Sequence, residues 1–425
     1  MVVKTGYKNS EIGLIPKDWN VSSLGSMLAT SPSYGINAAA IPYDSRFPTY
    51  LRITDISEDG RFIEEEKASV KHLLASQYIL VDGDLVFART GASVGKSYLY
   101  DVDDGELIFA GFLIRVQPDK NKLIPKYLKY FTHSKHFFRW VKVNSMRSGQ
   151  PGINGQEFAS LPLPTPPTVT EQKAIASVLS DADALIKSLE QLITKKRNIK
   201  QGAMQELLTG KKRLPGFSGK WNLKKLGDIA DPNQKWSFTG GPFGSNLKSS
   251  EYIDDGVRII QLQNIGDGEF HNESTVFTSY EKADELLSCN IYPGDIILSK
   301  MGDPVARACI VPHYHDRYLM CSDGIRLTID QKKYSTYFVY LSINATDFRT
   351  RAANAGTGST RKRIGLTELR NLELSCPGLP EQNLIANIIF DMDAELAELE
   401  QKLTKAKNIK QGMMQELLTG RTRLV

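Results

Sequence analysis

Two long stretches of the chain repeat apolar residues every three or four positions, which is the pattern of an amphipathic helix. The first covers residues 171–213 and the second residues 381–425. The apolar positions expected to face another helix or a docked partner are Ile175, Val178, Leu185, Leu189, Leu192 and Ile199 in the first stretch and Ile385, Ile388, Met392, Leu399, Ile409 and Met413 in the second. An isolated helix cannot bury such a stripe, so the pattern predicts that the two helices pack on each other, as in a coiled coil.

The two stretches are copies of one sequence. Residues 171–214 and 381–424 align without a gap, and 26 of the 44 positions are identical. The flanking segments repeat more weakly, as in VDGDLVFARTG at 81–91 and YPGDIILSKMG at 292–302. We expect an antiparallel helix pair, because a tandem duplication then closes on itself around a pseudo-twofold axis, like a symmetric dimer. About 38 residues at 1.5 Å each predict helices of roughly 57 Å.

Each of these helices contains one internal glycine, Gly202 and Gly412. Such a glycine costs a helix about 1 kcal/mol relative to alanine. The two glycines could be irregularities that the helices tolerate, but we favour a close crossing of the two helix backbones at these positions.

The segments between the helices predict compact mixed α/β domains. Strand-like apolar runs bounded by Gly and Asp occur at Tyr78–Arg89, Leu107–Val116, Ile291–Ser299 and Ile325–Ile329. Pro125 is expected to open a helix with Leu128, Phe131, Phe138 and Val141 on one side, and residues 334–349 take the same place in the second copy. The predicted fold class is therefore α+β, with globular domains at 1–170 and 214–380 separated by two long antiparallel helices at 171–213 and 381–425.

Composition narrows the class of protein further. The 425 residues carry a net charge of +5, a mild basic excess that permits nucleic-acid binding without requiring it. No apolar run approaches the roughly 18 residues that a membrane span needs, and the first residues lack the apolar core of a signal peptide. The four cysteines are widely and irregularly spaced, which suits reduced thiols in a cytoplasmic protein and offers no zinc site.

No string in the sequence predicts catalysis. TGASVGKS at 90–97 resembles a phosphate-binding loop, but the spacing requires glycine where Thr90 stands, so a turn between strands explains it better. His313 and His315 have no third ligand at a suitable spacing, and no metal site is expected. The chain therefore has the character of a binding protein that itself carries no cofactor.

Contact with nucleic acid is better supported, because both copies carry Gly-rich loops with side chains that bind phosphates and base edges. The candidate DNA-binding residues are Arg89, Arg147, Gln150 and Asn154 in the first copy and Ser245, Asn246, Lys248, Lys300, Thr360, Arg361, Lys362 and Arg363 in the second. Flexible surface loops are often basic without binding anything. The recurrence of such loops at matching places in two diverged copies nevertheless favours contact.

These residues carry a resemblance to the specificity subunit of type I restriction-modification enzymes, over essentially the whole chain. EQKAIASVLSDAD, EQNLIANIIFDMD and the paired MQELLTGKKRL and MQELLTGRTRL are similar to that family's two central repeats. IGLIPKDW resembles its usual opening, and GGPFGSNLK and STRKRI resemble its target-recognition domains. One departure is GQPGIN at 149–154, which lacks the basic residues of STRKR.

The resemblance implies a non-catalytic subunit in which each domain binds one half of a split double-stranded DNA target while the helices set the spacer between the halves. It also implies two identical methyltransferase subunits as partners, which carry S-adenosylmethionine, and restriction subunits, which use ATP and Mg²⁺. Two nearly identical helical faces would offer two like docking sites. An NTP-dependent enzyme centred on Gly91–Ser97, and a duplicated scaffold that binds only proteins, remain as alternatives.

Overall fold

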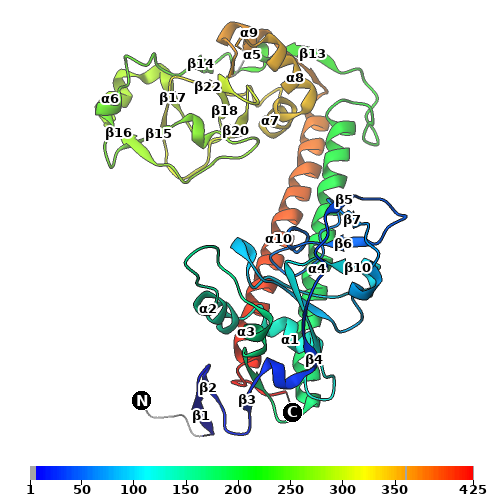
Figure 1. The fold of residues 1–425 in the computed structure, drawn as a ribbon. Helices are drawn as coiled ribbons and strands as arrows, with labels where there is room; N and C mark the ends of the chain where they lie inside the picture. Colours follow the sequence, from blue (N-terminus) through cyan, green and yellow to red (C-terminus); the bar gives the residue numbers. More distant parts are fainter. Residues whose placement is uncertain (1–5, 359–360, 425) are drawn as a thin grey trace. The chain divides into compact units, whose positions relative to one another are not determined.

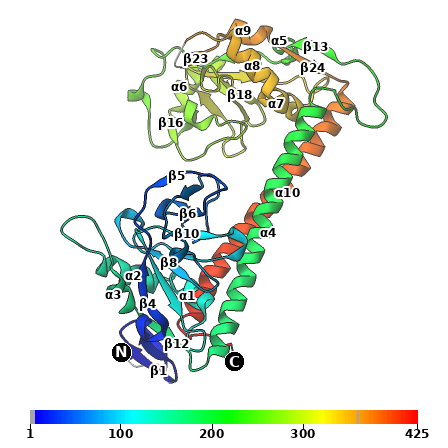
Figure 2. The ribbon, with the colours of Figure 1, turned by 45° about the vertical axis from the view of Figure 1, so that its right-hand side comes forward.

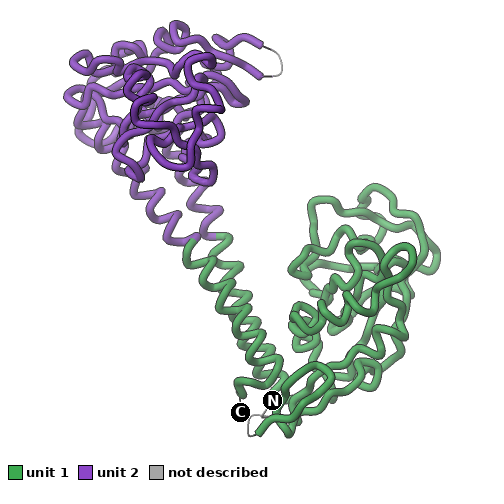
Figure 3. Tube along the Cα trace, turned by 90° about the vertical axis from the view of Figure 1, so that its left-hand side faces the viewer, with its two compact units in different colours: residues 1–191, 401–425 green, residues 192–400 purple. Residues whose placement is uncertain are grey.

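The computed structural model describes residues 6–358 and 361–424. The chain forms two compact units, unit 1 from residues 1–191 with 401–425 and unit 2 from residues 192–400 (Figure 3). Each unit contains one globular mixed α/β domain and a part of both long helices, which confirms the predicted fold class. No helix among the described residues is long and apolar enough to cross a membrane.

The long helices are α4 (Val169–Leu207) and α10 (Leu379–Leu417), of 39 residues each. Their length agrees with the predicted length of about 38 residues. Within each unit their segments lie side by side (Figures 1 and 2). The ion pairs between them are Asp183–Lys410 and Glu190–Lys407 in unit 1, and Lys196–Glu395 and Arg197–Glu400 in unit 2. Numbers rise along α4 as they fall along α10, so the helices are antiparallel in both units.

The apolar seam of the helix pair runs along one edge of the predicted stripe. Its buried residues are Ile175, Leu179, Ile186 and Ile193 in α4 and Ile385, Ile389, Leu396 and Leu399 in α10. Of the predicted residues, Val178, Leu189, Ile388, Met392 and Met413 are half-buried, whereas Leu185, Leu192, Ile199 and Ile409 are exposed. The buried residues of α4 repeat every seven positions, at Leu179, Ile186 and Ile193. Leu185 and Leu192, each one position earlier, therefore face outward.

The expected backbone crossing at the helix glycines is wrong. A Cβ atom added at Gly202 or at Gly412 would meet no atom within 4 Å. Both glycines lie on the exposed side of their helices. They therefore contribute no close helix contact within the described residues.

Unit 1 is built on two four-stranded sheets (Figure 1). The first is antiparallel, in the order β4 (Leu28–Tyr34), β11 (Leu113–Pro118), β8 (Leu85–Ala88) and β9 (Ser97–Leu99). The second has the order β10 (Leu107–Phe109), β6 (Thr49–Leu51), β7 (Ala68–Val70) and β5 (Ala40–Pro42), with β10 and β6 parallel. Two-stranded sheets are formed by β1 (Tyr7–Ser10) with β2 (Gly13–Pro16) and by β3 (Asn20–Ser23) with β12 (Pro162–Thr165).

Unit 2 repeats this plan with changes at both edges of the second sheet. Its first sheet has the order β14 (Phe238–Gly240), β22 (Gly324–Leu327), β18 (Ile296–Ser299) and β20 (Ala308–Ile310). Its second has the order β16 (Val276–Thr278), β15 (Val257–Ile260), β21 (Tyr318–Met320) and β17 (Asn290–Ile291), with β15 and β21 parallel. The two-stranded sheets pair β13 (Asn222–Lys225) with β24 (Glu373–Cys376) and β19 (Met301–Gly302) with β23 (Lys362–Arg363).

Short helices complete the domains, and one of them corrects a prediction. They are α1 (Pro125–Phe131), α2 (Lys135–Asn144) and α3 (Gly155–Ala159) in unit 1, and α5 (Leu226–Ile229), α6 (Tyr280–Glu285), α7 (Thr336–Asn344), α8 (Thr346–Ala355) and α9 (Leu366–Asn371) in unit 2. The single helix expected after Pro125 breaks, and Ser134 caps the N-terminus of α2. This restart leaves Phe138 half exposed, although it was expected on the buried side.

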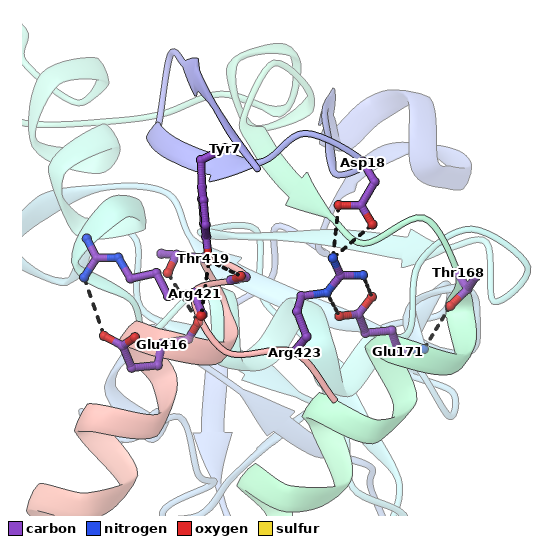
Figure 4. Close-up of polar contacts among 9 residues, drawn as sticks. Tyr7, Asp18, Thr168, Glu171, Glu416, Thr419, Arg421 and Arg423 are labelled. Carbon is purple, nitrogen blue, oxygen red and sulfur yellow. Dashed lines mark hydrogen bonds and ion pairs between the residues drawn. The ribbon is translucent and has the colours of Figure 1, made fainter. Parts of the chain in front are cut away.

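The two ends of the helix pair are closed by equivalent contacts. In unit 1, Arg423 pairs with Glu171 in the first turn of α4 and with Asp18 (Figure 4). In unit 2, Arg213 pairs with Glu381 in the first turn of α10. Trp19 packs against Gly420 as Trp221 packs against Gly210. The sequence repeat is thus a repeat of structure as well.

Candidate nucleic-acid interface

In both units the first sheet places a cation at the end of a buried strand. Arg89 follows β8 and Lys300 follows β18, and the preceding turns are fixed by the equivalent carboxylates Asp84 and Asp295. Asp295 is paired with the buried Arg326 at 2.8 Å, and burial raises the pKa of this carboxyl group. The repeated Gly-Asp in the sequence therefore positions Arg89 and Lys300 on equivalent frameworks.

A glycine is required beside each of these cations. A Cβ at Gly35 would lie 2.2 Å from the carbonyl oxygen of Ala110, and a Cβ at Gly241 would lie 1.8 Å from that of Cys321. These distances are too short for any residue with a Cβ atom. In unit 1, the end of β4 that carries Tyr34 therefore passes close to the backbone of Ala110. The same close approach recurs in unit 2.

The late loops predicted to bind nucleic acid lie against these cations. In unit 1, the amide of Ile153 donates to the carbonyl of Arg89 at 2.9 Å, and the amide of Gly91 donates to Pro151 at 2.9 Å. In unit 2, the amide of Ile364 donates to the carbonyl of Lys300 at 2.9 Å, and β19 pairs with β23. The structure thus brings Arg89 together with the loop that carries Gln150, and Lys300 together with Arg363.

Several of the predicted residues already have a structural partner. Arg147 pairs with Glu157 at 2.5 Å, and Asn154 caps the N-terminus of α3. Arg363 pairs with Asp323 at 2.6 Å, and Lys362 donates to the carbonyl of Ala353 at 2.9 Å. These contacts fix the shape of the loops.

Arg89, Lys300 and Arg361 have no carboxylate within 4.0 Å in the part of the chain that the structure describes. Their positive charge is therefore available for an anionic ligand. Arg89 and Lys300 are half-buried and Arg361 is exposed, so all three can be reached from solvent.

The remaining predicted residues lie elsewhere or outside the described part. Ser245, Asn246 and Lys248 are exposed in the loop after β14, and no contact among the described residues joins them to Lys300 or Arg361. Lys248 begins the short 3-10 helix Ser249–Glu251, where its amide donates to Glu251. Thr360 lies outside the described residues.

Two aromatic residues at this site were missed by sequence reasoning. The guanidinium of Arg89 lies 5.3 Å from the ring centre of Tyr34 and 5.8 Å from that of Phe112. Both rings are about half exposed, at 45% and 55%. The sequence feature that could have indicated them is an aromatic residue next to a glycine between two strand-like runs. It occurs at Tyr34-Gly35 and at Gly111-Phe112.

The other chemical motifs offer no catalytic arrangement. TGASVGKS forms the turn between β8 and β9, and Lys96 pairs with Glu58 at 2.7 Å. Among the described residues no group of three or more His, Cys, Asp or Glu side chains is placed to hold a metal ion. His315 instead packs edge-on against Phe277 and Tyr318.

Comparison with known proteins agrees with this organisation. Residues 16–197 and 218–409 each match the family model of the type I restriction modification DNA specificity domain. The chain is 26% identical to the specificity subunit assigned to the type I restriction enzyme MjaX of Methanocaldococcus jannaschii, over 98% of this chain and 97% of that protein. It is 22% identical to the MjaVIII specificity subunit of the same organism, over 96% and 94%.

A solved structure shares the fold. The S subunit of a type I restriction-modification system from M. genitalium superposes with a TM-score of 0.57 at 14% identity, over 98% of both chains. Since the family model covers most of the sequence in two copies, the chain belongs to the family of type I restriction-modification DNA specificity subunits, which bind DNA and are non-catalytic.

Proposed function

We propose that this specificity subunit binds a bipartite DNA target, with one half-site for each globular domain, and that its helices dock the subunits that modify and cut DNA. The observation that carries the proposal is that equivalent frameworks present different side chains. Arg89, Phe112 and Gln150 in unit 1 stand where unit 2 has Lys300, Asp323 and Arg361.

The chemistry of these replacements favours two unlike half-sites. Unit 1 surrounds one guanidinium with aromatic rings, whereas unit 2 places Lys300 near an Asp323–Arg363 pair and the exposed Arg361. Base edges in the major groove differ in their donors, acceptors and methyl groups, so surfaces of different polarity select different sequences. A framework held constant by Gly-Asp turns lets these side chains change without loss of the fold.

The outward-facing apolar residues of α4 support a docking role. Leu185, Leu192 and Ile199 are spaced by seven residues and are exposed by 55%, 38% and 46%. Residues at that spacing lie on one face of a helix and match the packing of a further helix. We assign this face, the α4 stripe, to a helical segment of a partner subunit.

Two grooves at equivalent places support docking of two like partners. Groove 1 lies between the α1–α2 junction and the last turns of α10, where Gln411, Met414 and Gln415 line it. Groove 2 lies between the α7–α8 junction and the last turns of α4, where Gln201, Met204 and Gln205 line it. These residues correspond at the repeat offset of 210, so each unit has a groove against the equivalent face of a long helix.

The partners in this proposal are two methyltransferase subunits, together with restriction subunits. S-adenosylmethionine, ATP and Mg²⁺ would be bound by those partners, in the cytoplasm. The role of this chain is to place the methyltransferase and restriction subunits on DNA, and its described residues provide the surfaces that bind DNA and those partners.

Exchange of one domain tests the proposal. Residues 20–165, from the start of β3 to the end of β12, would be replaced by the same segment of another family member. The hybrid is co-expressed with the methyltransferase subunits, and methylated adenines are mapped in genomic DNA. One half of the methylated sequence should change while the other half and the spacer persist. A change in both halves, or methylation without a bipartite motif, would contradict the proposal.

A further inference from the structure

We propose that Arg89 of unit 1 selects a guanine in the half-site bound by that unit, through a two-bond contact in the major groove. The inference rests on the proposed function and adds to it a named residue and a named base. It starts from the juxtaposition of Arg89 with Tyr34 and Phe112 (the Arg89 cluster).

The position of the guanidinium is fixed from several directions. The amide of Arg89 donates to the carbonyl of Phe112 at 3.1 Å, and its carbonyl accepts from Ile153. Its Nε donates to the carbonyl of Gly111 at 3.0 Å. The aromatic rings of Tyr34 and Phe112 lie within 6 Å of the guanidinium, at the distance of a cation–π contact. The side chain is thus held in place before any ligand binds.

The ring of Tyr34 is itself anchored beside the loop that carries Gln150. The hydroxyl of Tyr34 accepts a hydrogen bond from the amide of Gly155 at 3.1 Å. Gly155 begins α3, directly after the loop that contacts Arg89. The Arg89 cluster and the loop 144–155 therefore form one connected surface.

Two donor groups of Arg89 remain unused. Among the described residues no acceptor bonds to Nη1 or Nη2, and no carboxylate lies within 4.0 Å of the guanidinium. With Nε occupied, the terminal Nη groups provide a pair of donors. That pair matches the O6 and N7 acceptors of guanine, whose contact with arginine is the commonest specific contact in the major groove.

The surroundings favour a base edge over a phosphate. A phosphate-binding arginine gains from further cations nearby, yet among the described residues the side chains that contact the Arg89 guanidinium are the half-exposed rings of Tyr34 and Phe112. Flat apolar surface fits bases and thymine methyl groups, whereas phosphates stay hydrated. In unit 2 the equivalent position is Lys300, near the charged residues Asp323 and Arg363, so this contact belongs to unit 1 alone.

The test maps methylated adenines in DNA of cells that express the chain with its methyltransferase partners. Arg89→Gln and Arg89→Met should make one guanine position degenerate, with preference for guanine there reduced about 5-fold or more, since one two-bond contact contributes about 1–3 kcal/mol of discrimination. The half-site of unit 2 should be unchanged, which also shows that the variant is folded. Arg46→Gln, an exposed arginine of unit 1 paired with Asp44, is the matched control and should leave the motif intact.

Two outcomes would overturn the inference. One is a uniform fall in methylation with an unchanged motif in both Arg89 variants, which is the signature of a phosphate contact. The other is a wild-type motif without a G·C pair in the half-site that domain exchange assigns to unit 1. Failure of the proposed function would look different, because the wild-type chain would then give no bipartite motif at all.

Discussion

Arg423 holds the buried carboxylate of Glu171 with two hydrogen bonds, of 2.5 and 2.8 Å, and so joins the segment after α10 to the first turn of α4 (Figure 4). The Glu171 side chain is 1% exposed and that of Arg423 is 27% exposed. Arg213 and Glu381 form the same pair in unit 2, where the carboxylate is 2% exposed. The pair ties the end of one long helix to the start of the other at equivalent places in both units.

Removal of Arg423 should destabilise unit 1. In Arg423→Ala the carboxylate of Glu171 stays buried without its charged partner, and we expect the free energy of unfolding to fall by about 2 kcal/mol, less than for a fully buried pair because Arg423 is partly exposed. Urea unfolding monitored by tryptophan fluorescence measures this, since Trp19 lies beside Arg423. Arg421→Ala is the control, because the Arg421–Glu416 pair is exposed and worth about 0.5 kcal/mol or less. Equal effects of the two variants would contradict the prediction.

Neighbouring positions on α4 should separate docking from folding. Leu192 is 38% exposed and Ile193 is 4% exposed, although both are apolar. We expect Leu192→Gln to change the unfolding free energy by less than about 0.5 kcal/mol. Ile193→Gln buries an amide in the seam and should cost about 2 kcal/mol or more.

Sedimentation of the chain with its methyltransferase partner provides the second measurement. Leu192→Gln combined with Leu185→Gln and Ile199→Gln should weaken association at least 10-fold while the chain remains folded. Association that is unaffected by all three changes would remove the α4 stripe from the docking surface.

The sequence predicted those features that repeat or that follow from a period. The α4 and α10 duplication was visible because 26 of 44 positions are identical, and the antiparallel pairing followed from closure of the repeat. The sequence did not set the phase of the seam, because Leu185 and Ile186 are both apolar and the 3–4 spacing fits either. Only the partner helix decides which of them is buried.

The basic residues of the candidate site could be predicted from the sequence, whereas its aromatic residues could not. Arg89 and Lys300 stood out because they end matching strands after a Gly-Asp turn. Tyr34 and Phe112 lie 55 and 23 positions from Arg89 in the chain, and pairing of β4 and β8 with β11 brings them together. Sequence distance hides such contacts. It also hid the internal partners of Arg147 and Arg363.

The glycines inside the long helices should be replaceable with a gain in stability. Gly202 and Gly412 have open space where a Cβ would lie. Alanine at either position should raise the unfolding free energy by about 0.5–1 kcal/mol, because glycine loses more backbone entropy in a helix. Thermal unfolding of the isolated chain measures the gain. Destabilisation by Gly202→Ala would show a packing requirement at that position.

Stability of unit 1 should fall as the pH drops below about 6.5. Burial lowers the pKa of His133, which donates from Nδ1 to the carbonyl of Lys129 at 2.9 Å, and the nearby Lys129 and Lys410 act in the same direction. The unfolded chain then binds a proton near pH 6.5 that the folded chain binds only at lower pH. Stability is therefore full above the unfolded pKa and is lost as the pH falls below it.

Unfolding free energies at pH 7.5 and 5.5 check this relation. The fall between them should be smaller in His133→Gln than in the parent chain. His136 also has a pKa lowered by burial, so His136→Gln shows how much of the remaining slope belongs to that residue. A slope that neither change alters would assign the acid sensitivity to other groups.

Matched insertions into both long helices should lengthen the DNA spacer. Seven residues added after Lys195 in α4 and seven after Leu396 in α10 keep the seam in phase, because the seam repeats every seven residues. The inserted turns add about 10 Å of helix, close to the length of three base pairs. Methylation mapping should then find the same two half-sites about three base pairs further apart. The control places seven Gly/Ser residues in the loop 211–220, which leaves both helices unchanged and should leave the spacer unchanged. An unaltered spacer in the helix variant would mean that the helix pair does not set the distance between the half-sites, because both half-sites would still be bound at their original separation.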